Sequence, residues 1–159
     1  MILGLLVAVA AIGAPRDDAA IEQWLNQHAQ RAHSVELTAT RYRVVGDLDG
    51  DGRDDMAVLY TLRPRSGQRG ESRYLAVFKR QRDASHEHSR DGLRYHAHVL
   101  ISGPGAGEAT RVTILKRSVV VEMLTFSPGD AACCPTHPAT RRYRLTARGL
   151  TLIRSAAQK

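Results

Sequence analysis

The chain has 159 residues, a length that suits one domain with a single hydrophobic core. Hydrophobic residues make up 43% and charged residues 25%, and this balance excludes an intrinsically disordered chain. The formal net charge is +7, but the arginines are scattered and only 5% of the residues are aromatic. With no nucleic-acid-binding motif either, we expect no specific nucleic acid partner.

Residues 1–14 form an apolar run that is shorter than the roughly 20 residues needed to span a bilayer. An export signal fits this run best, with one domain over residues 15–159. The alternative is an N-terminal strand or buried helix, although so many alanines disfavour a strand. No Lys or Arg precedes the run, and Pro15 stands next to the expected cleavage point. We expect a periplasmic or secreted protein with no transmembrane segment in its mature form.

An amphipathic helix is predicted from Asp17 to Ala32, where apolar residues recur at three- and four-residue spacing. The apolar stripe consists of Ile21, Trp24, Leu25, His28 and Ala32. Pro15 and two aspartates stand at the start, where proline is tolerated and negative charge complements the helix dipole. We expect Trp24 to anchor this helix on a sheet.

The rest of the chain has the period of two that is typical of strands. Eight strands are expected, over residues 40–45, 56–62, 74–79, 93–101, 111–116, 119–126, 142–146 and 150–153. The continuous apolar runs 56–60 and 74–78 indicate central strands covered on both faces. Short connections at 116–118 and 147–149 predict hairpins and therefore antiparallel pairing. The predicted fold class is α+β, with the helix packed on a mainly antiparallel meander sheet of about seven to eight strands.

A stretch of nine residues, 47–55, is rich in aspartate and is called the acidic loop below. Its candidate ligands stand at positions one, three, five and nine: Asp47, Asp49, Asp51 and Asp55. Carboxylates crowded in one turn repel each other, so an ordered loop favours a counter-cation. Hard oxygen ligands in a flexible loop select Ca²⁺, with Mg²⁺ second. Gly52 would let the chain bend so that the backbone carbonyl of Arg53 becomes a further ligand.

The acidic loop is not an EF-hand, because Val58 stands at the position where that motif requires glutamate. It resembles the Asp-x-Asp-x-Asp-Gly-x-x-Asp loop of strand-loop-strand calcium sites, as in integrin-type (FG-GAP) propeller blades. A propeller needs several such blades, and this chain has one loop and no internal repeat. We expect a structural calcium ion that pins two strands, with Asp54 facing solvent. The alternative is an Asp-Gly-rich turn without metal.

The only two cysteines, Cys133 and Cys134, are adjacent. Neighbouring Cα atoms are about 3.8 Å apart, so a disulfide between them would form a strained ring. In an oxidising compartment we expect this vicinal disulfide first, with free or intermolecular thiols as the alternatives. A reactive Cys–His pair with His137 is a weaker hypothesis, because no third group orients it.

Three segments together resemble a known family: GDLDGDGRDDMAVLYTL at 46–62, YLAVF at 74–78, and GDAACCPT at 129–136, which is followed by the strand RRYRLT. The combination resembles uncharacterised exported bacterial proteins related to the LppP/LprE lipoproteins, over roughly residues 40–153. The resemblance implies an exported, non-enzymatic domain. This sequence departs from the lipoproteins because it has no N-terminal cysteine for lipidation.

Histidines supply a second and weaker metal hypothesis. Residues 86–88 read His-Glu-His, and His96 and His98 alternate with the apolar residues of 93–99. A regular strand would aim both imidazoles outward on one face, which could suit zinc. Neither group has cysteine or carboxylate partners at an established zinc spacing, so the alternative is exposed, titrating histidine.

No catalytic motif or cofactor fingerprint accompanies these residues. The sequence therefore favours a non-enzymatic, calcium-stabilised binding domain that engages an exported protein or another envelope component. The basic loop 63–73 or 81–94 would form the contact. One alternative is a periplasmic inhibitor or immunity-type protein against an envelope-acting hydrolase. A metal-dependent hydrolase that uses calcium or the histidines is the less favoured alternative.

Overall fold

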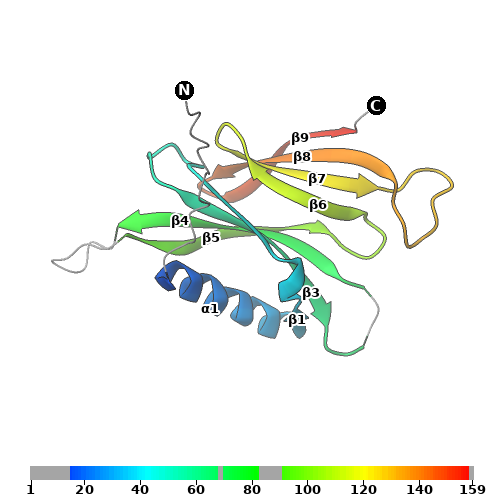
Figure 1. The fold of residues 1–159 in the computed structure, drawn as a ribbon, viewed down its shortest axis with the longest axis horizontal. Helices are drawn as coiled ribbons and strands as arrows, with labels where there is room; N and C mark the ends of the chain where they lie inside the picture. Colours follow the sequence, from blue (N-terminus) through cyan, green and yellow to red (C-terminus); the bar gives the residue numbers. More distant parts are fainter. Residues whose placement is uncertain (1–14, 68–69, 83–90, 158–159) are drawn as a thin grey trace, which may run out of the picture.

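The computed structural model describes residues 15–67, 70–82 and 91–157. These residues form one α-helix and nine strands in three layers (Figure 1). The expected export signal, 1–14, and the His-Glu-His segment, 86–88, lie outside the described residues. Within the described part of the chain, no helix is both long enough and apolar enough to cross a membrane.

The first sheet is antiparallel and has five strands. They are β1 (Ser34–Glu36), β2 (Tyr42–Gly46), β3 (Asp55–Pro64), β4 (Ser72–Arg82) and β5 (Asp91–Ser102). The main order is β1-β3-β4-β5, and β2 pairs with the beginning of β3 while β1 pairs with its end. The short 3₁₀ helix η1 (Thr38–Thr40) lets the chain pass from β1 to β2 along that edge.

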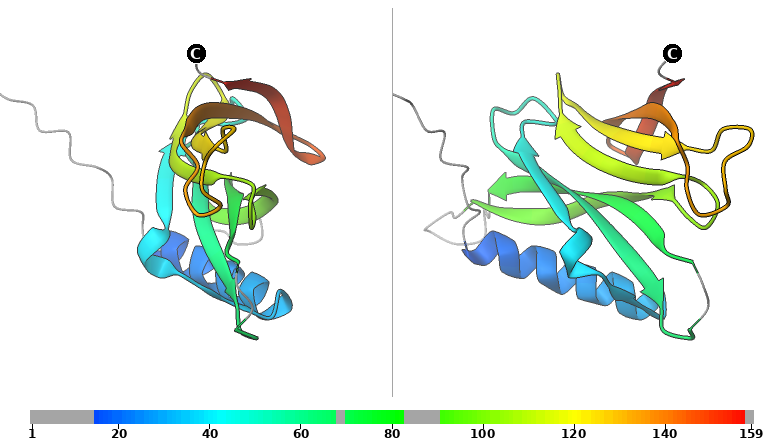
Figure 2. Two further views of the ribbon diagram at one scale, coloured as in Figure 1. Left: turned by 90° about the vertical axis from the view of Figure 1, so that its right-hand side faces the viewer. Right: turned by 45° about the vertical axis from the view of Figure 1, so that its right-hand side comes forward.

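The second sheet is a four-stranded antiparallel meander of β6 (Glu108–Ile114), β7 (Ser118–Thr125), β8 (His137–Thr146) and β9 (Gly149–Ala157). All eight predicted strands are present with shifted ends, and the three-residue β1 was not predicted. The prediction of a single meander sheet is wrong, because the strands divide between two sheets. Figure 2 shows the helix, the first sheet and the second sheet as successive layers. The central strands β3 and β4 are apolar on both faces. The helix covers one face of their sheet, and the second sheet covers the other face.

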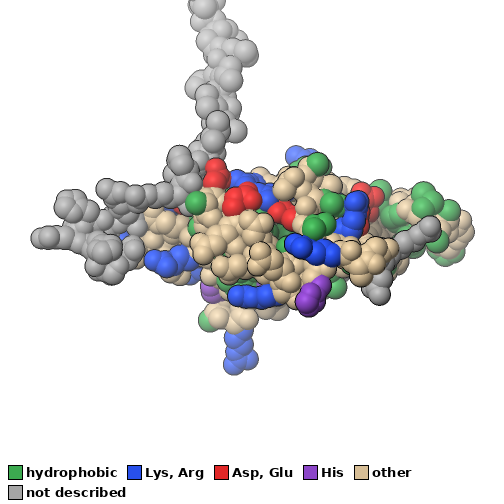
Figure 3. Space-filling view, turned by 90° about the horizontal axis from the view of Figure 1, so that it is seen from below, with side chains coloured by type: hydrophobic (Ala, Val, Ile, Leu, Met, Phe, Trp, Pro, Cys, Tyr) green, Lys and Arg blue, Asp and Glu red, His purple; other side chains and the backbone are tan. Residues whose placement is uncertain are grey.

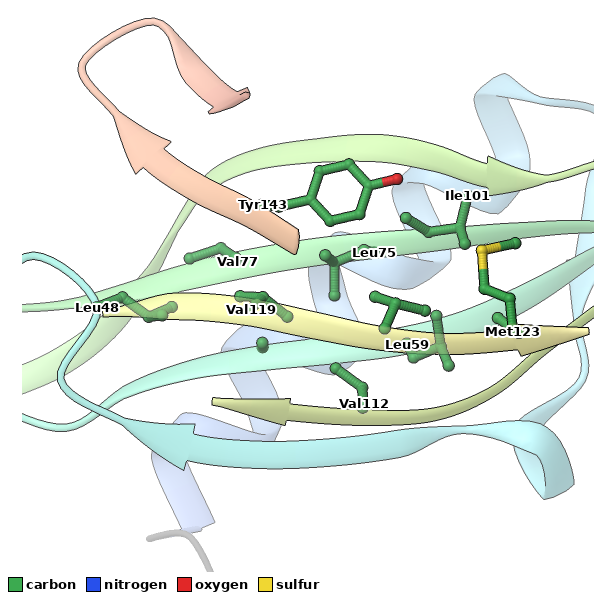
Figure 4. Packing of buried hydrophobic residues seen from close by; sticks show 12 residues of the cluster. Leu48, Leu59, Leu75, Val77, Ile101, Val112, Val119, Met123 and Tyr143 are labelled. Carbon is green, nitrogen blue, oxygen red and sulfur yellow. The ribbon is translucent and has the colours of Figure 1, made fainter. Parts of the chain in front are cut away.

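The main core lies between the two sheets (Figure 4). The first sheet contributes Leu59, Leu75 and Val77, which are fully buried. The second contributes Val119 and Val121, also fully buried, together with other apolar side chains such as Met123 and Tyr143. This packing is the contact that the single-sheet prediction omitted.

Helix α1 (Pro15–Arg31) covers the other face of the first sheet. Its buried apolar residues are Ile21, Leu25 and Ala29. The prediction that Trp24 anchors the helix is confirmed, because its ring lies 6.0 Å from Tyr60, 5.7 Å from Phe78 and 4.3 Å from Tyr95, between centroids. Ala32 was predicted in the stripe, but it lies beyond the end of the helix and is exposed.

An arginine between two glutamates ties the helix to the first sheet. Arg41 donates from Nε to Glu36 Oε1 at 2.7 Å and from Nη2 to Glu36 Oε2 at 2.6 Å. It also pairs with Glu22 on α1. Burial lowers the pKa of Arg41, but its hydrogen bonds to Glu36 and Glu22 outweigh this effect and raise it overall. The ion pair is therefore a firm contact between the two layers.

Candidate metal centre

The acidic loop connects β2 to β3, and the pair Gly46 and Asp55 closes the strand ladder at its base. Two glycines within it have left-handed backbone angles, with φ of +87° at Gly50 and +80° at Gly52. The sharp bend predicted at Gly52 is therefore present, and its geometry favours glycine.

Aspartate side chains hold the loop by accepting hydrogen bonds from its own backbone. Asp47 accepts from the amides of Gly50 and Gly52, at 2.5 and 3.1 Å. Asp51 Oδ1 accepts from the amide of Arg53 at 2.9 Å. Such bonds also stabilise a turn without metal, so the loop conformation by itself does not distinguish the two hypotheses.

Three of the predicted ligands come together. One carboxylate oxygen from each of Asp47, Asp49 and Asp55 lies within 4.8 Å of the other two. Ca²⁺–oxygen distances of about 2.3–2.6 Å place ligands on opposite sides of the ion roughly 5 Å apart, so this separation suits one cation. Asp51 is not part of this group of three, and Asp54 is exposed, as predicted.

A lysine from the next strand already contacts this group. Lys79 Nζ on β4 lies 2.5 Å from Asp49 Oδ2. The hydrogen bond from Lys79 is the main cause that lowers the pKa of Asp49, and the same bond raises the pKa of Lys79. The sequence argument that the crowded aspartates favour a bound counter-cation is therefore incomplete, because the fold supplies one positive charge itself.

Asp55 is in a different position, because it is almost fully buried, with 1% of its surface exposed. Its two oxygens accept from the amide of Leu48 at 3.0 Å and from the amide of Arg80 at 2.9 Å. Burial is the main cause that raises the pKa of Asp55, and the nearby charges of Asp49 and Asp51 add to it. A cation beside Asp55 would offset this loss of solvation.

The weaker histidine hypothesis does not match the structure. Phe78 pairs with Tyr95 whereas Val77 pairs with Ala97, so β5 bulges at His96. His98 consequently lies on the helix side, with its ring 5.3 Å from Trp24, while His96 Nε2 lies 3.0 Å from the carbonyl oxygen of Thr146 in the second sheet. The prediction that both imidazoles point the same way is wrong.

His98 instead belongs to an aromatic cluster under the helix. Its ring lies 4.6 Å from that of His28, between centroids, and each imidazole Nδ1 is 2.7 Å from a tyrosine hydroxyl, Tyr60 for His28 and Tyr95 for His98. Burial lowers the pKa of both histidines, and for His28 the proximity of His98 and Arg31 adds to the effect. The folded state therefore favours two neutral imidazoles.

This cluster predicts a stability that depends on pH. Because both folded-state pKa values lie below the usual 6.5, the contribution is complete above that pH and is lost as the pH falls below it. We expect the melting temperature to fall by a few degrees from about pH 7.5 to about pH 5.5. The double variant His28→Gln with His98→Gln should show a smaller fall. An equal fall in both proteins, measured by circular dichroism, would refute this account.

The structure joins Cys133 to Cys134 in a disulfide. This bond leaves no free thiol in the chain, so neither sulfur is available for the Cys–His hypothesis. Both residues are exposed in the segment 126–136 between β7 and β8. Asp130 folds that segment back on itself, because it accepts from the amides of Ser127 and Thr136 at 2.7 and 3.0 Å.

Comparison with known proteins identified no relative, since no family model, curated protein or solved structure matches the chain significantly.

Proposed function

We propose that the acidic loop binds one Ca²⁺ ion and that the chain is an exported, calcium-stabilised binding domain without enzymatic activity. The observation that carries the calcium proposal is the convergence of Asp47, Asp49 and Asp55 within 4.8 Å. Asp51 and the backbone carbonyl of Arg53 would complete the ligand set at the positions that the sequence pattern assigns to them.

The proposed ion is structural. Asp47 and Asp49 lie in the loop, whereas Asp55 is the first residue of the central strand β3. A cation shared by the three would fix the loop to the sheet, and it would relieve the raised pKa of buried Asp55. Lys79 would compete with it, because its ammonium group occupies one oxygen of Asp49.

Two observations support a binding role over a metal-dependent hydrolase. First, His96 and His98 lie on opposite faces of β5, so they cannot serve one metal together. Second, the segment 126–136 exposes apolar side chains at one end of the molecule, among them Phe126, Ala131 and Ala132. Figure 3 shows apolar side chains gathered at that end, on the right. An exposed apolar group of this kind suits a protein partner.

The contact surface predicted from the sequence was one of two basic loops. Residues 68–69 and 83–90 of those loops lie outside the described part of the chain. We retain export to the cell envelope as a proposal, on the apolar run 1–14 and the family resemblance.

Calcium should raise the thermal stability of the protein. An ion at about 100 times its Kd adds about 2.7 kcal/mol to the free energy of unfolding, which corresponds to a rise of roughly 5–10 °C in Tm for a domain of this size. We expect this rise when wild type is melted in millimolar CaCl₂ instead of EDTA. The variant Asp49→Asn should lose it, and Asp54→Asn should keep it, because Asp54 carries the same charge but is exposed outside the group of three.

Removing the competing lysine sharpens the test. The variant Lys79→Met should have a lower melting temperature than wild type in EDTA, because Asp49 loses its partner. Calcium should raise the melting temperature of this variant by more than it raises that of wild type. If Lys79 is the only cation that neutralises the loop, calcium will not change the melting temperature of either protein relative to EDTA. That result would disprove the calcium proposal.

A further inference from the structure

A cavity of about 520 Å³ opens where one end of the first sheet faces the second sheet. Five segments of the chain meet there: the acidic loop, the central strand β4, the edge strand β5, the β6–β7 turn, and the end of β8 with the turn that follows it. The approach of β2 to β6 brings the acidic loop close to the β6–β7 turn, since a Cβ atom added at Gly46 would lie 3.1 Å from Ile114 Cγ2. The charged and titratable side chains that line the cavity are Asp49, Lys79, His96, Lys116, Arg117 and Arg144.

The charge of this cavity is strongly positive. Its single carboxylate, on Asp49, is engaged with Lys79. The remaining cations, Lys116, Arg117 and Arg144, have no carboxylate within 4 Å among the residues that the structure describes. Like charges gathered around a concave surface repel each other, and a bound anion would remove that repulsion.

Two of these cations stand in a strained turn. Lys116 and Arg117 both have left-handed backbone angles, with φ of +48° and +57°. The turn is closed by Leu115 and Ser118, whose amides each donate to the other's carbonyl oxygen, at 2.9 and 3.1 Å. Two-residue hairpins of this shape favour Asn-Gly, because both positions need a positive φ that most residues with a long side chain disfavour. Long cationic side chains here are not explained by turn formation, and strain of this kind often marks a functional site.

Arg117 is also held in place by the acidic loop. A Cβ atom built at Gly50 would lie 2.4 Å from Arg117 Cζ, so the guanidinium group rests against the backbone of that glycine. Elsewhere in the lining, His96 Nε2 is 3.0 Å from the carbonyl oxygen of Thr146, beside the turn that follows β8. These two contacts therefore hold a cationic group and an imidazole in place in the cavity lining.

We propose that this basic cavity binds a phosphate group carried on an organic body. Guanidinium and ammonium groups are the usual partners of phosphate oxygens, and three unpaired cations suit a multiply charged anion. The volume exceeds what one inorganic phosphate fills and lies in the range of small-molecule sites. Leu48, Leu145 and Ala147 supply an apolar part of the wall for the rest of the ligand. The proposal does not rest on calcium binding.

The first test is titration calorimetry with inorganic pyrophosphate, in EDTA and at physiological salt. We expect saturable binding that weakens at least tenfold in Arg117→Gln and in Arg144→Gln, since each loses a charge-assisted hydrogen bond. The matched control is Arg148→Gln, which removes the same charge from the neighbouring turn but does not line the cavity. It should change the affinity by less than twofold.

Three results would overturn the proposal: no saturable binding, unchanged affinity in both cavity variants, or an equal loss in the control. Because EDTA is present, failure here is distinct from failure of the calcium proposal. Two further probes identify the source of the phosphate. Cosedimentation with phosphatidylcholine vesicles that contain phosphatidylglycerol, abolished by Arg117→Gln, would assign a lipid headgroup. Binding of glycerol phosphate without vesicle binding would assign a soluble ligand.

Discussion

The variant Arg41→Ala is expected to lower the free energy of unfolding by about 3–5 kcal/mol. Arg41 makes two hydrogen bonds to Glu36, and the side chains of the two residues are 9% and 6% exposed. Without the guanidinium group, the carboxylate of Glu36 remains buried and has no cation to balance it. Loss of the contact with Glu22 also loosens the helix from the sheet. Urea denaturation with and without the substitution measures the difference.

Arg43 provides the matched control for that variant. It also reaches the helix, through Asp18 and Glu22, but its side chain is 31% exposed and those of its partners are 41% and 45% exposed. Ion pairs open to solvent contribute about 1 kcal/mol or less. Arg43→Ala should therefore lower the free energy of unfolding by about 1 kcal/mol or less. Equal losses in the two variants would contradict this account and would show that Glu36 becomes solvated when Arg41 is removed.

The variant Asp55→Ala is expected to lower the free energy of unfolding by about 2–4 kcal/mol, even in EDTA. It leaves the amides of Leu48 and Arg80 without their acceptor at the start of the central strand. Each unsatisfied buried donor is unfavourable by about 1–3 kcal/mol, and relief of the buried charge offsets part of the sum. Denaturation in EDTA isolates this structural role from any effect of calcium.

Asp54→Ala serves as the control, because its side chain is exposed and its backbone is unchanged. We expect a change within about 0.5 kcal/mol. If Asp55→Ala changes the free energy of unfolding in EDTA as little as Asp54→Ala does, the two hydrogen bonds to Asp55 contribute little to stability. That result would contradict the structural role given to Asp55.

The helix and eight strands could be predicted because their patterns are local. Apolar spacing of three and four marks α1, and the continuous runs in β3 and β4 mark strands buried on both faces. The same runs contain the information that the single-sheet prediction missed. A sheet that is apolar on both faces needs a covering layer on each face, and the only predicted helix could cover one face. The alternating strands 111–116, 119–126, 142–146 and 150–153 were the remaining candidates to cover the second face.

The candidate site was harder to predict because its contacts join distant parts of the chain. The spacing of the aspartates revealed the acidic loop, but Lys79 reaches Asp49 from a separate strand. The bulge at His96 reverses the side-chain alternation within β5, and a regular pattern gives no sign of it. The basic cavity draws on five segments, and its one local signal was the Lys-Arg pair in a two-residue hairpin.

The acidic loop and the basic cavity share Asp49, so their two ligands are expected to influence each other. Calcium at Asp49 would release Lys79, which also lines the cavity. The cavity would then gain a free cation, and calcium would strengthen phosphate binding. By thermodynamic linkage, the phosphate ligand would strengthen calcium binding by the same factor.

The most direct test of the calcium proposal is titration of the metal-free protein with CaCl₂ in a calorimeter. The account predicts one ion per chain for wild type and for Asp54→Asn, and no saturable binding for Asp49→Asn. Heats no larger than those of dilution in all three proteins would contradict it, and so would equal binding by Asp49→Asn and wild type.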